Sequence, residues 1–481
     1  MWTNTCQSRR HFLGSNAFNL GALGLASLLK SDGLLGAANP EKPLLERANY
    51  DTLPKKPQFE PRAKAMISLF MGGGPSHIDM FDPKPLLKKY DGKLFPAGDI
   101  KFDNPGGASR TVMASPFEFK KRGECGMEIS ELLPNIAGIA DDMCLIRSMN
   151  LGGIRNHVAG MRAMDTGSGL GGRPALGSWL TYGLGSENQN LPAFVSLVVG
   201  HDPPGSPFWS SGMLPSLYQG THVREQEPRI MNLDPPAYLK GAPQAHQLGL
   251  LEKLNREHLT EHPGELDLQA RIASYELAAR MQTSAHEVFD LSGESKATRA
   301  LYGLDNENTR RIGEACLIAR RLVERGVRFV QIWYYAWDMH AAINETLPIR
   351  CSVVDQPSAG LVRDLKGRGM LDTTLVYWGG EMGRLPVIQN RFDRGKPGRD
   401  HNTDGFSVWL AGGGVKGGYV HGATDEFGLA AQDKVVHHHD YLATVMHLHG
   451  MDAEKLVYKR GIRNETILGG AAGSVVRDVL A

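Results

Sequence analysis

Apolar runs of strand length, each ending in glycine and polar residues, most constrain how this chain can fold. The first run covers residues 65–71 (AMISLFM) and leads directly into Gly72, Gly73 and Gly74. Similar runs recur at residues 144–149, 328–335, 374–378 and 407–410. Runs that are apolar at nearly every position are typical of parallel strands buried on both faces. The chain therefore predicts a sheet that is covered on both sides.

Segments with helical periodicity separate these runs. Within residues 308–325, Ile312, Cys316, Ala319 and Val323 recur at the spacing of one helix face. Further helices are expected at residues 130–140, with Ser130 as the cap, and at residues 266–281, 356–368 and 440–449. Strands that alternate with helices predict an α/β fold, a mostly parallel sheet sandwiched by helices. Ligands of such sheets bind beyond the carboxyl ends of the strands.

The charge balance argues against partners that recognise a strongly charged surface. The 481 residues include 53 Lys and Arg against 52 Asp and Glu, which gives a formal net charge of +1. A protein that binds nucleic acid or an anionic membrane surface carries a marked basic excess. We therefore expect no nucleic-acid partner. Hydrophobic residues make up 41% of the chain, which is enough for a sizeable core.

The first 38 residues have the pattern of a twin-arginine export signal. Arg9 and Arg10 precede an uncharged stretch, residues 14–29, which glycine, serine and asparagine dilute too strongly for a membrane span. Small residues at positions 36–38 supply a cleavage site. This pattern predicts export by the twin-arginine machinery to the periplasm or beyond, with no transmembrane span in the mature chain. A disordered or anchoring amino terminus is the alternative.

The rest of the chain divides by composition. Residues 39–62 contain five prolines and predict a surface linker, so the folded domain is expected to cover residues 63–481. Residues 200–265 are rich in Pro, Gly and His and predict an insertion made of loops. Cys6 lies in the signal segment, and no CxxC pair occurs among Cys125, Cys144, Cys316 and Cys351. That spacing argues against a thiolate metal site and leaves disulfides or free thiols open.

Carboxylates and imidazoles lie close to the ends of the predicted strands. Asp79 comes after the first strand, Asp338 and His340 after the strand at 328–335, and Glu381 after the strand ending at Trp378. His401 lies just before the strand at 407–410. Such oxygen and nitrogen donors suit a divalent cation, Zn, Mn, Mg or Ca, and these five residues are the predicted ligands. The structural alternative for each is a helix cap or a loop ion pair.

Several long motifs together resemble one protein family. They are SRRHFL, FMGGGPSHIDMFDPKP, GRPALGSWLTYGLG, WGGEMGR and GRDHNTDGFSVWLAGGGVKGG. On them the chain resembles exported bacterial proteins of the domain-of-unknown-function 1501 family. Residues 155–167, 369–383 and 440–450 also resemble the sulfatase and alkaline-phosphatase superfamily. The resemblance implies an alkaline-phosphatase-like, sulfatase-like core with loop insertions.

This resemblance also implies roles for individual residues. The superfamily's nucleophile, a serine, a threonine or a formylglycine-forming cysteine, aligns here with Asn156 or His157. His157 would then act as a general acid or base, or form a phosphoenzyme. Arg384 or Arg155 would stabilise an oxyanion. Ser76 in the glycine-rich loop is a second, weaker candidate for the nucleophile.

Three functional hypotheses follow. The first is an exported, metal-dependent hydrolase of sulfate or phosphate esters, acting on a small molecule or a polysaccharide. The second is a non-catalytic binding or assembly protein that retains the fold. The third is a hydrolase that uses His157 as a nucleophile without a metal. For the histidine run 437–439 we expect a structural or solvated role, because adjacent side chains point in different directions.

Overall fold

The computed structural model describes residues 50–96, 98–103, 108–202, 208–261, 266–389 and 395–481. The expected export signal and the first part of the expected linker lie outside these residues. Within the described ranges, no helix is both long enough and apolar enough to cross a membrane.

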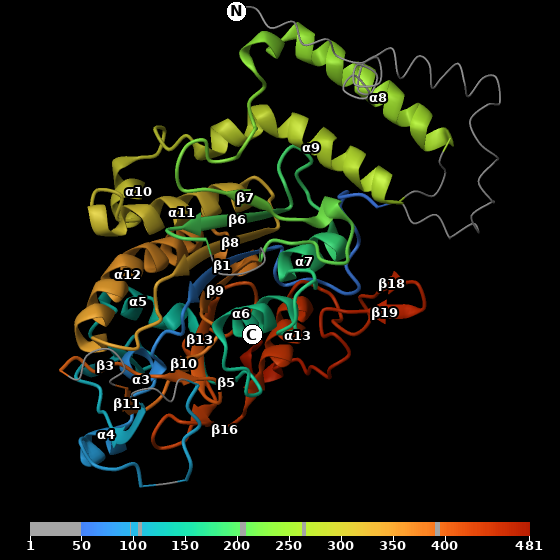
Figure 1. The fold of residues 1–481 in the computed structure, drawn as a ribbon. Helices are drawn as coiled ribbons and strands as arrows, with labels where there is room; N and C mark the ends of the chain where they lie inside the picture. The colour runs from blue at the N-terminus through green and yellow to red at the C-terminus, as the bar shows by residue number, and fades with distance from the viewer. Residues whose placement is uncertain (1–49, 97, 104–107, 203–207, 262–265, 390–394) are drawn as a thin grey trace, which may run out of the picture. The chain divides into compact units, whose positions relative to one another are not determined.

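A nine-stranded sheet forms the centre of the described chain (Figure 1). In spatial order its strands are β14 (Tyr419–His421), β5 (Met143–Asn150), β13 (Phe406–Ala411), β9 (Thr374–Gly379), β1 (Ala65–Gly72), β8 (Phe329–Tyr335), β6 (Phe194–Val199) and β7 (Thr221–Val223), with β17 (Val436–His437) also paired to β5. Every residue of β1, β6, β9 and β13 is buried, as expected for strands with continuous apolar runs.

The core of the sheet is parallel. β1 pairs in parallel with β8 and β9, and β6 pairs in parallel with β7 and β8. β13 runs antiparallel to both β5 and β9, so β5 points the same way as β9. The fold is therefore an α/β fold in which a mixed sheet with parallel core strands is flanked by helices.

Helices cover the two faces of this sheet (Figure 1). Alternate residues of β1 serve opposite faces: Ile67 and Leu69 belong to one hydrophobic core, Met66 and Phe70 to the other. The first core also contains residues of α5 (Pro134–Ala137), α11 (Glu307–Glu324) and α12 (Ile343–Gly367). The second contains residues of α6 (His157–Thr166), α7 (Leu176–Leu184) and α13 (His438–Leu448). Cys144, Cys316 and Cys351 are buried in these cores as free thiols.

Three helix expectations differ from the structure. Ser130 does not cap a helix but ends β4 (Met127–Ser130), and α5 is a single turn that begins only at Pro134. The Asp355 carboxylate accepts the backbone N–H groups of Asn135 and Ile136, each at 2.8 Å, and so caps that turn from α12. α12 begins at Ile343, not at residue 356, because burial of its apolar face prevails over the two prolines inside it. Residues 242–261, expected as loop, form α8 (Ala242–Glu261), followed by α9 (Leu266–Phe289).

The described part of the expected linker, residues 50–62, is bonded to the folded body. The backbone N–H of Lys55 donates to the carbonyl of Leu184 at 2.9 Å, and that of Arg62 donates to Leu448 at 2.8 Å. These bonds place the segment along the surface near α7 and α13, within the same folded unit.

A buried carboxyl group, that of Asp165, lies in the last turn of α6. Asp165 is 2% exposed, and its Oδ1 accepts a hydrogen bond from Gln331 Nε2 at 3.1 Å. Among the described residues its Oδ2 has no hydrogen-bond partner. Burial raises the pKa of this carboxyl to about 7.

Asp165→Asn is expected to remove a pH dependence of stability. Because the pKa of Asp165 is higher in the folded than in the unfolded protein, the protonated carboxyl stabilises the folded state fully below about pH 4. This stabilisation is lost as the pH rises through 7. The unfolding free energy of the wild type should therefore fall by about 4 kcal/mol relative to the variant between pH 4 and pH 8. Urea unfolding at several pH values across this range measures the difference. The same pH dependence of the unfolding free energy in both proteins would contradict the prediction.

Candidate metal centre

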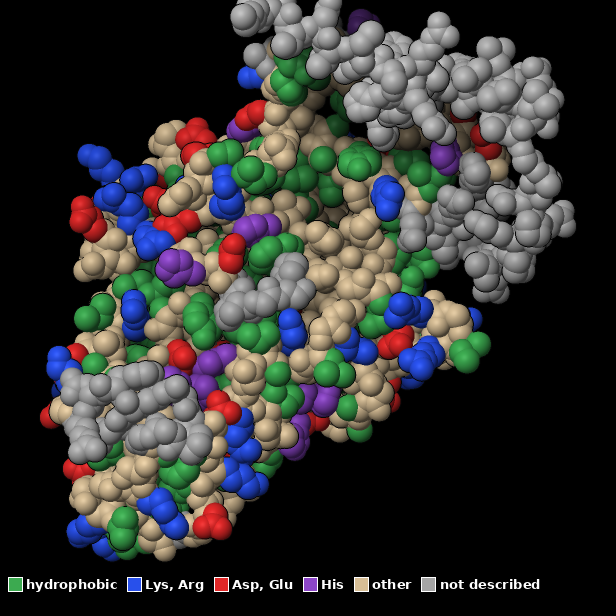
Figure 2. All heavy atoms as spheres, viewed as in Figure 1, with side chains coloured by type: hydrophobic (Ala, Val, Ile, Leu, Met, Phe, Trp, Pro, Cys, Tyr) green, Lys and Arg blue, Asp and Glu red, His purple; other side chains and the backbone are tan. Residues whose placement is uncertain are grey.

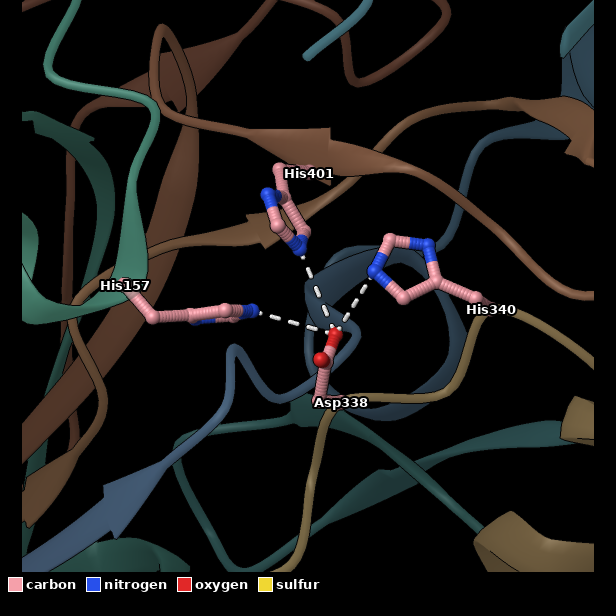
Figure 3. Close-up of side chains that lie close together, drawn as sticks. All are labelled: His157, Asp338, His340 and His401. Atoms are coloured by element: carbon pink, nitrogen blue, oxygen red, sulfur yellow. Dashed lines mark hydrogen bonds and ion pairs between the residues drawn. The ribbon is translucent and has the colours of Figure 1, made fainter. Parts of the chain in front are cut away.

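Four side chains converge at one edge of the sheet: His157, Asp338, His340 and His401 (Figure 3). One ligating atom from each lies within 4.8 Å of all the others. His157 opens α6 after β5, and Asp338 and His340 follow the end of β8. Because β5 and β8 run in the same direction, their carboxyl ends share this edge. His401 begins β12 (His401–Asn402), which pairs with β10 (Gly383–Arg384) and brings it to the same place.

The carboxylate of Asp338 is the centre of this group. Its Oδ1 lies 3.1 Å from His157 Nε2, 2.9 Å from His340 Nε2 and 3.3 Å from His401 Nε2. Figure 3 shows all three imidazoles pointing at this oxygen. The Asp338 side chain is 31% exposed, whereas His401 is only 5% exposed. The centre is therefore enclosed on the histidine side and open to solvent at Asp338.

Each imidazole is held by a second contact through its other ring nitrogen. Nδ1 of His157 lies 2.6 Å from Glu381 Oε1, Nδ1 of His401 lies 2.8 Å from Asp103 Oδ2, and Nδ1 of His340 lies 2.5 Å from Gln389 Oε1. Carboxylate and amide oxygens accept hydrogen bonds, so each Nδ1 must carry the proton. An imidazole that binds a cation is neutral, so with Nδ1 protonated its lone pair would lie on Nε2, which faces the centre. Metal-binding histidines are oriented in this way.

The donor set fits a small divalent cation. A tetrahedral site with bonds of about 2.0–2.1 Å has ligand atoms about 3.3 Å apart. The three Nε2 atoms lie at 2.9–3.3 Å from Asp338 Oδ1, close to that value, and all four ligating atoms lie within 4.8 Å of one another. Three imidazole nitrogens and one carboxylate oxygen favour Zn or another transition metal, since Mg and Ca prefer all-oxygen ligands.

The pKa values of the residues in the centre depend strongly on one another. Burial lowers the pKa of His157, but contacts with Asp338 and Glu381 outweigh it and raise the pKa to about 9. Burial raises the pKa of Asp338, but hydrogen bonds from His157, His340 and His401 outweigh it and hold the pKa well below its ordinary value. Burial lowers the pKa of His401, and Asp338 offsets this only in part. The carboxylate is therefore ionised at neutral pH and available to a cation.

Arg384, expected to stabilise an oxyanion, is a buried clamp. It is 0% exposed, and its guanidinium donates to the carbonyls of Gly73, Gly74, Trp337 and Arg399. Its Nη2 also lies 2.8 Å from Asp338 Oδ1. These bonds join the loops that follow β1 and β8 to the strand that carries His401. The geometry fits a positioning role.

Gly73 allows two of these loops to touch. Its φ is +107°, and a Cβ atom there would lie 2.6 Å from the backbone nitrogen of Asp338. Its own N–H donates to Glu381 Oε1 at 3.0 Å. Only glycine combines this conformation with so close an approach, which places the loop after β1 directly against the centre.

Two of the five expected ligands lie outside the group of four. Asp79 is 1% exposed and forms an ion pair with Arg399, with its Oδ2 3.0 Å from Arg399 Nε, and it also accepts a hydrogen bond from Ser76 Oγ. Glu381 accepts from Gly73 and contacts His157 from behind, on the side away from the centre. These partners satisfy both carboxylates elsewhere, so neither fits a ligand role in this geometry.

The two positions expected at the nucleophile have different roles. Asn156 is exposed and caps α6, where its side-chain oxygen accepts the backbone N–H of Ala159 at 3.2 Å. His157, expected to be catalytic, lies among the four converging side chains. Asp103 and Gln389 were not foreseen, because neither follows one of the predicted strands. The sequence indicates only that each histidine ligand needs a hydrogen-bond acceptor for its second ring nitrogen, and it does not show which residue supplies it.

Arg384→Lys is expected to destabilise the protein although it keeps the charge. A lysine presents one ammonium group in place of the planar fork, so several buried carbonyls lose their donors. The expected loss is about 3 kcal/mol or more of unfolding free energy, measured by denaturant titration. Arg460→Lys, at an exposed position of β18 (Tyr458–Arg460), is the control and should change stability little. Equal stability of both variants would show that the hydrogen bonds of the Arg384 guanidinium do not stabilise the fold.

Solved structures that superpose on the chain are distant in sequence. The PsFucS1 sulfatase from Pseudoalteromonas sp. is 13% identical at a TM-score of 0.34, covering 81% of this chain and 68% of that one. Ps i-CgsB in complex with k-i-k-neocarrahexaose is 12% identical at 0.35, covering 82% and 73%. The phosphonate monoester hydrolase SpPMH from Silicibacter pomeroyi is 12% identical at 0.32, covering 72% and 71%.

The sequence itself identifies a family. No curated protein matches the chain. The model of the family described as "Protein of unknown function (DUF1501)" matches residues 63–480, which include all four side chains of the centre. The chain therefore belongs to the DUF1501 family.

Proposed function

We propose that the protein is an exported, metal-dependent hydrolase of sulfate or phosphate esters, acting on a small molecule or a polysaccharide. One observation carries the metal centre: three imidazoles present Nε2 to one carboxylate while an acceptor holds each Nδ1. The ester class rests on the sequence resemblance to sulfatases and alkaline phosphatases. Export rests on the paired arginines and the uncharged stretch at the amino terminus.

The proposed ligands are His157, Asp338, His340 and His401. A divalent ion held there would act as a Lewis acid toward the ester and lower the pKa of a water molecule toward neutrality. Zn fits the donor set best, with Mn, Mg and Ca as the other candidates. His157 has both ring nitrogens engaged in this arrangement, so the nucleophile is water and not this imidazole.

Residues around the centre orient its groups and face the substrate. Glu381 is 0% exposed and fixes the ring of His157, while Arg384 fixes the Asp338 carboxylate. Tyr335 is half-buried at the end of β8, with its ring 6.0 Å from that of His157 and edge-on to it. Burial first, then the charges of Asp338 and Glu381, raise the pKa of its phenol. This phenol therefore keeps its proton and can donate a hydrogen bond to an ester oxygen.

The non-catalytic alternative rests on Asn156. Where the superfamily resemblance places a nucleophile, this exposed side chain caps a helix. A binding protein would hold a metal or sugar with no turnover. The two functions are separated by a panel of sulfate and phosphate esters: the hydrolase requires turnover that depends on the four ligands, and metal binding without turnover favours the binding protein.

Metal analysis of the purified protein tests the centre directly. Purification without chelator or nickel resin should yield about one equivalent of one divalent metal per chain. Asp338→Ala and His401→Ala should each lower the metal content, because each removes one of the four donors, and Asp338 is the only charged one among them. His437→Ala, in the exposed part of the histidine run, is the matched control and should keep the metal. Metal-free wild type after incubation with Zn, Mn, Mg and Ca would refute the centre and the hydrolase.

Glu381→Gln tests how His157 is held. The amide oxygen can still accept from Nδ1, but the negative charge that makes the imidazole a stronger ligand is lost. Metal affinity should fall about 10- to 100-fold, measured by titration against a chelator of known affinity. Glu426→Gln changes an exposed carboxylate and should leave affinity unchanged. Complete loss of binding would instead indicate that Glu381 is a direct ligand. An unchanged metal affinity would show that the charge of Glu381 does not act through His157.

A further inference from the structure

One buried pair of polar side chains, Asp165 and Gln331, joins helix α6 to strand β8. Gln331 lies between Phe329 and Trp333 on the side of β8 that faces the second core, and Asp165 approaches it from α6. Each of the two residues is 2% exposed. Figure 2 shows other Asp and Glu side chains in red at the surface, where water solvates them. Asp165 lacks this access, so the pair must satisfy its polar atoms within the protein.

Only part of the hydrogen-bonding capacity of this pair is used. Gln331 Nε2 donates to Asp165 Oδ1 at 3.1 Å. Among the described residues, neither Asp165 Oδ2 nor Gln331 Oε1 has a hydrogen-bond partner. Both atoms are acceptors when the carboxyl is ionised, so they cannot bond to each other in that state. A proton on Oδ2 makes it a donor and can give both oxygens a partner at once.

The neighbours of the pair carry no charge that would favour a carboxylate. On the adjacent strands β1 and β6, the residues level with Gln331 are Ser68 and Ser196. The titratable side chains that the charge of Asp165 affects are Tyr377 of β9 and Tyr441 of α13. Burial raises the pKa of both phenols well above the ordinary value, so both are neutral.

Burial is also the largest influence on the Asp165 carboxyl, and it raises the pKa to about 7. The amide of Gln331 and the backbone N–H of Leu176, at the start of α7, lower this pKa because they stabilise a carboxylate. Burial prevails over both. Asp165 therefore holds its proton about three pH units beyond an ordinary aspartate.

We propose that Asp165 carries a proton in the folded protein and forms a two-bond ring with Gln331 that holds α6 against β8, and that loss of this proton loosens the helix. In the ring, the Oδ2–H group of Asp165 donates to Oε1 of Gln331, and the Nε2–H group donates to Oδ1. When the pH rises, the proton passes to solvent and Oδ2 becomes an acceptor like Oε1. A buried carboxylate with too few donors then weakens the contact between helix and strand.

The ring lies at one end of α6, and His157 lies at the other. The ten residues of this helix span about 15 Å. The helix packs closely on Glu381, since a Cβ atom at Gly160 would lie 3.2 Å from Glu381 Cγ. A shift of α6 therefore moves His157 relative to Glu381 and Asp338. This effect on metal binding rests on the centre proposed above, whereas the ring does not.

Infrared difference spectroscopy of the full chain tests the proton. A protonated carboxyl has a C=O stretching band above the amide bands of the backbone, and a carboxylate lacks it. At pH 6 ordinary Asp and Glu are ionised, so the spectrum of the wild type minus that of Asp165→Asn should contain this band, which should vanish by about pH 8.5. Asp372→Asn, at an exposed position, is the matched control and should keep the band. A spectrum without the band at pH 6 would overturn the proposal, because water or an ion would then satisfy an ionised Asp165.

Gln331→Met tests the ring itself. Methionine has a similar length but lacks the amide, so both bonds of the ring are lost. The C=O band of Asp165 should move to a higher frequency, as expected for a protonated carboxyl without these hydrogen bonds. An unmoved band would mean that the proton bonds elsewhere and would overturn the ring.

Metal affinity at two pH values tests the coupling to the centre. The Asp165→Asn side chain can keep both bonds of the ring at every pH, and titration of the metal ligands is common to both proteins. The dissociation constant of the wild type divided by that of the variant should be near one at pH 6. It should rise toward about tenfold at pH 8, where about a tenth of the chains keep the proton.

A ratio that stays constant between these pH values would overturn the coupling. Zn is the probe, titrated against a chelator of known affinity. A wild type that binds no metal would refute the proposed centre and the coupling together. The infrared bands then decide the ring separately, because they are measured without metal.

Discussion

The Oδ1 atom of Asp338 is the point on which the site depends. Three imidazoles and the Arg384 guanidinium all approach this one oxygen, so the carboxylate offsets positive charge that would otherwise be buried without a partner. The same guanidinium bonds the backbone of the loops after β1 and β8. One anion therefore links the electrostatics of the centre to the course of the loops that build it.

Sequence reasoning located the edge of the sheet but only part of the site. Asp338 and His340 lie there because the carboxyl ends of parallel strands share an edge, and that rule needs no structure. His401 precedes β13 and reaches the same edge because β13 runs antiparallel to its neighbours, which the sequence does not show. Asp79 satisfies the same rule yet pairs with Arg399, because the sequence does not show which buried cation is nearer. Glu381 also reaches the edge, but with its carboxylate behind His157. The direction in which a side chain points toward its neighbours depends on its rotamer, and the pattern of apolar residues in a strand does not predict that rotamer.

The fold was predictable where burial is two-sided or follows a helix face, as in β1, β9 and α11. It was not predictable where tertiary contacts decide. The α12 helix runs through Pro348 and Pro357 because its buried face packs against the sheet. The α5 helix starts at Pro134, where Asp355 from another helix caps it, and it ends after one turn at Gly138. The α8 helix was missed because no face of it is buried, so no apolar periodicity set it apart from loop.

His157 brings these observations to one chemical consequence. A side chain at the start of α6, where the resemblance places a nucleophile, is turned by Glu381 so that Nε2 faces Asp338. An imidazole held at Nδ1 and directed at a cation site has no lone pair left for attack on an ester. In the proposed centre, His157 would be a ligand at the position where the resemblance places a nucleophile. In the proposed hydrolase, water and ester would enter from the open side at Asp338, and the ion would take the water as a fifth ligand.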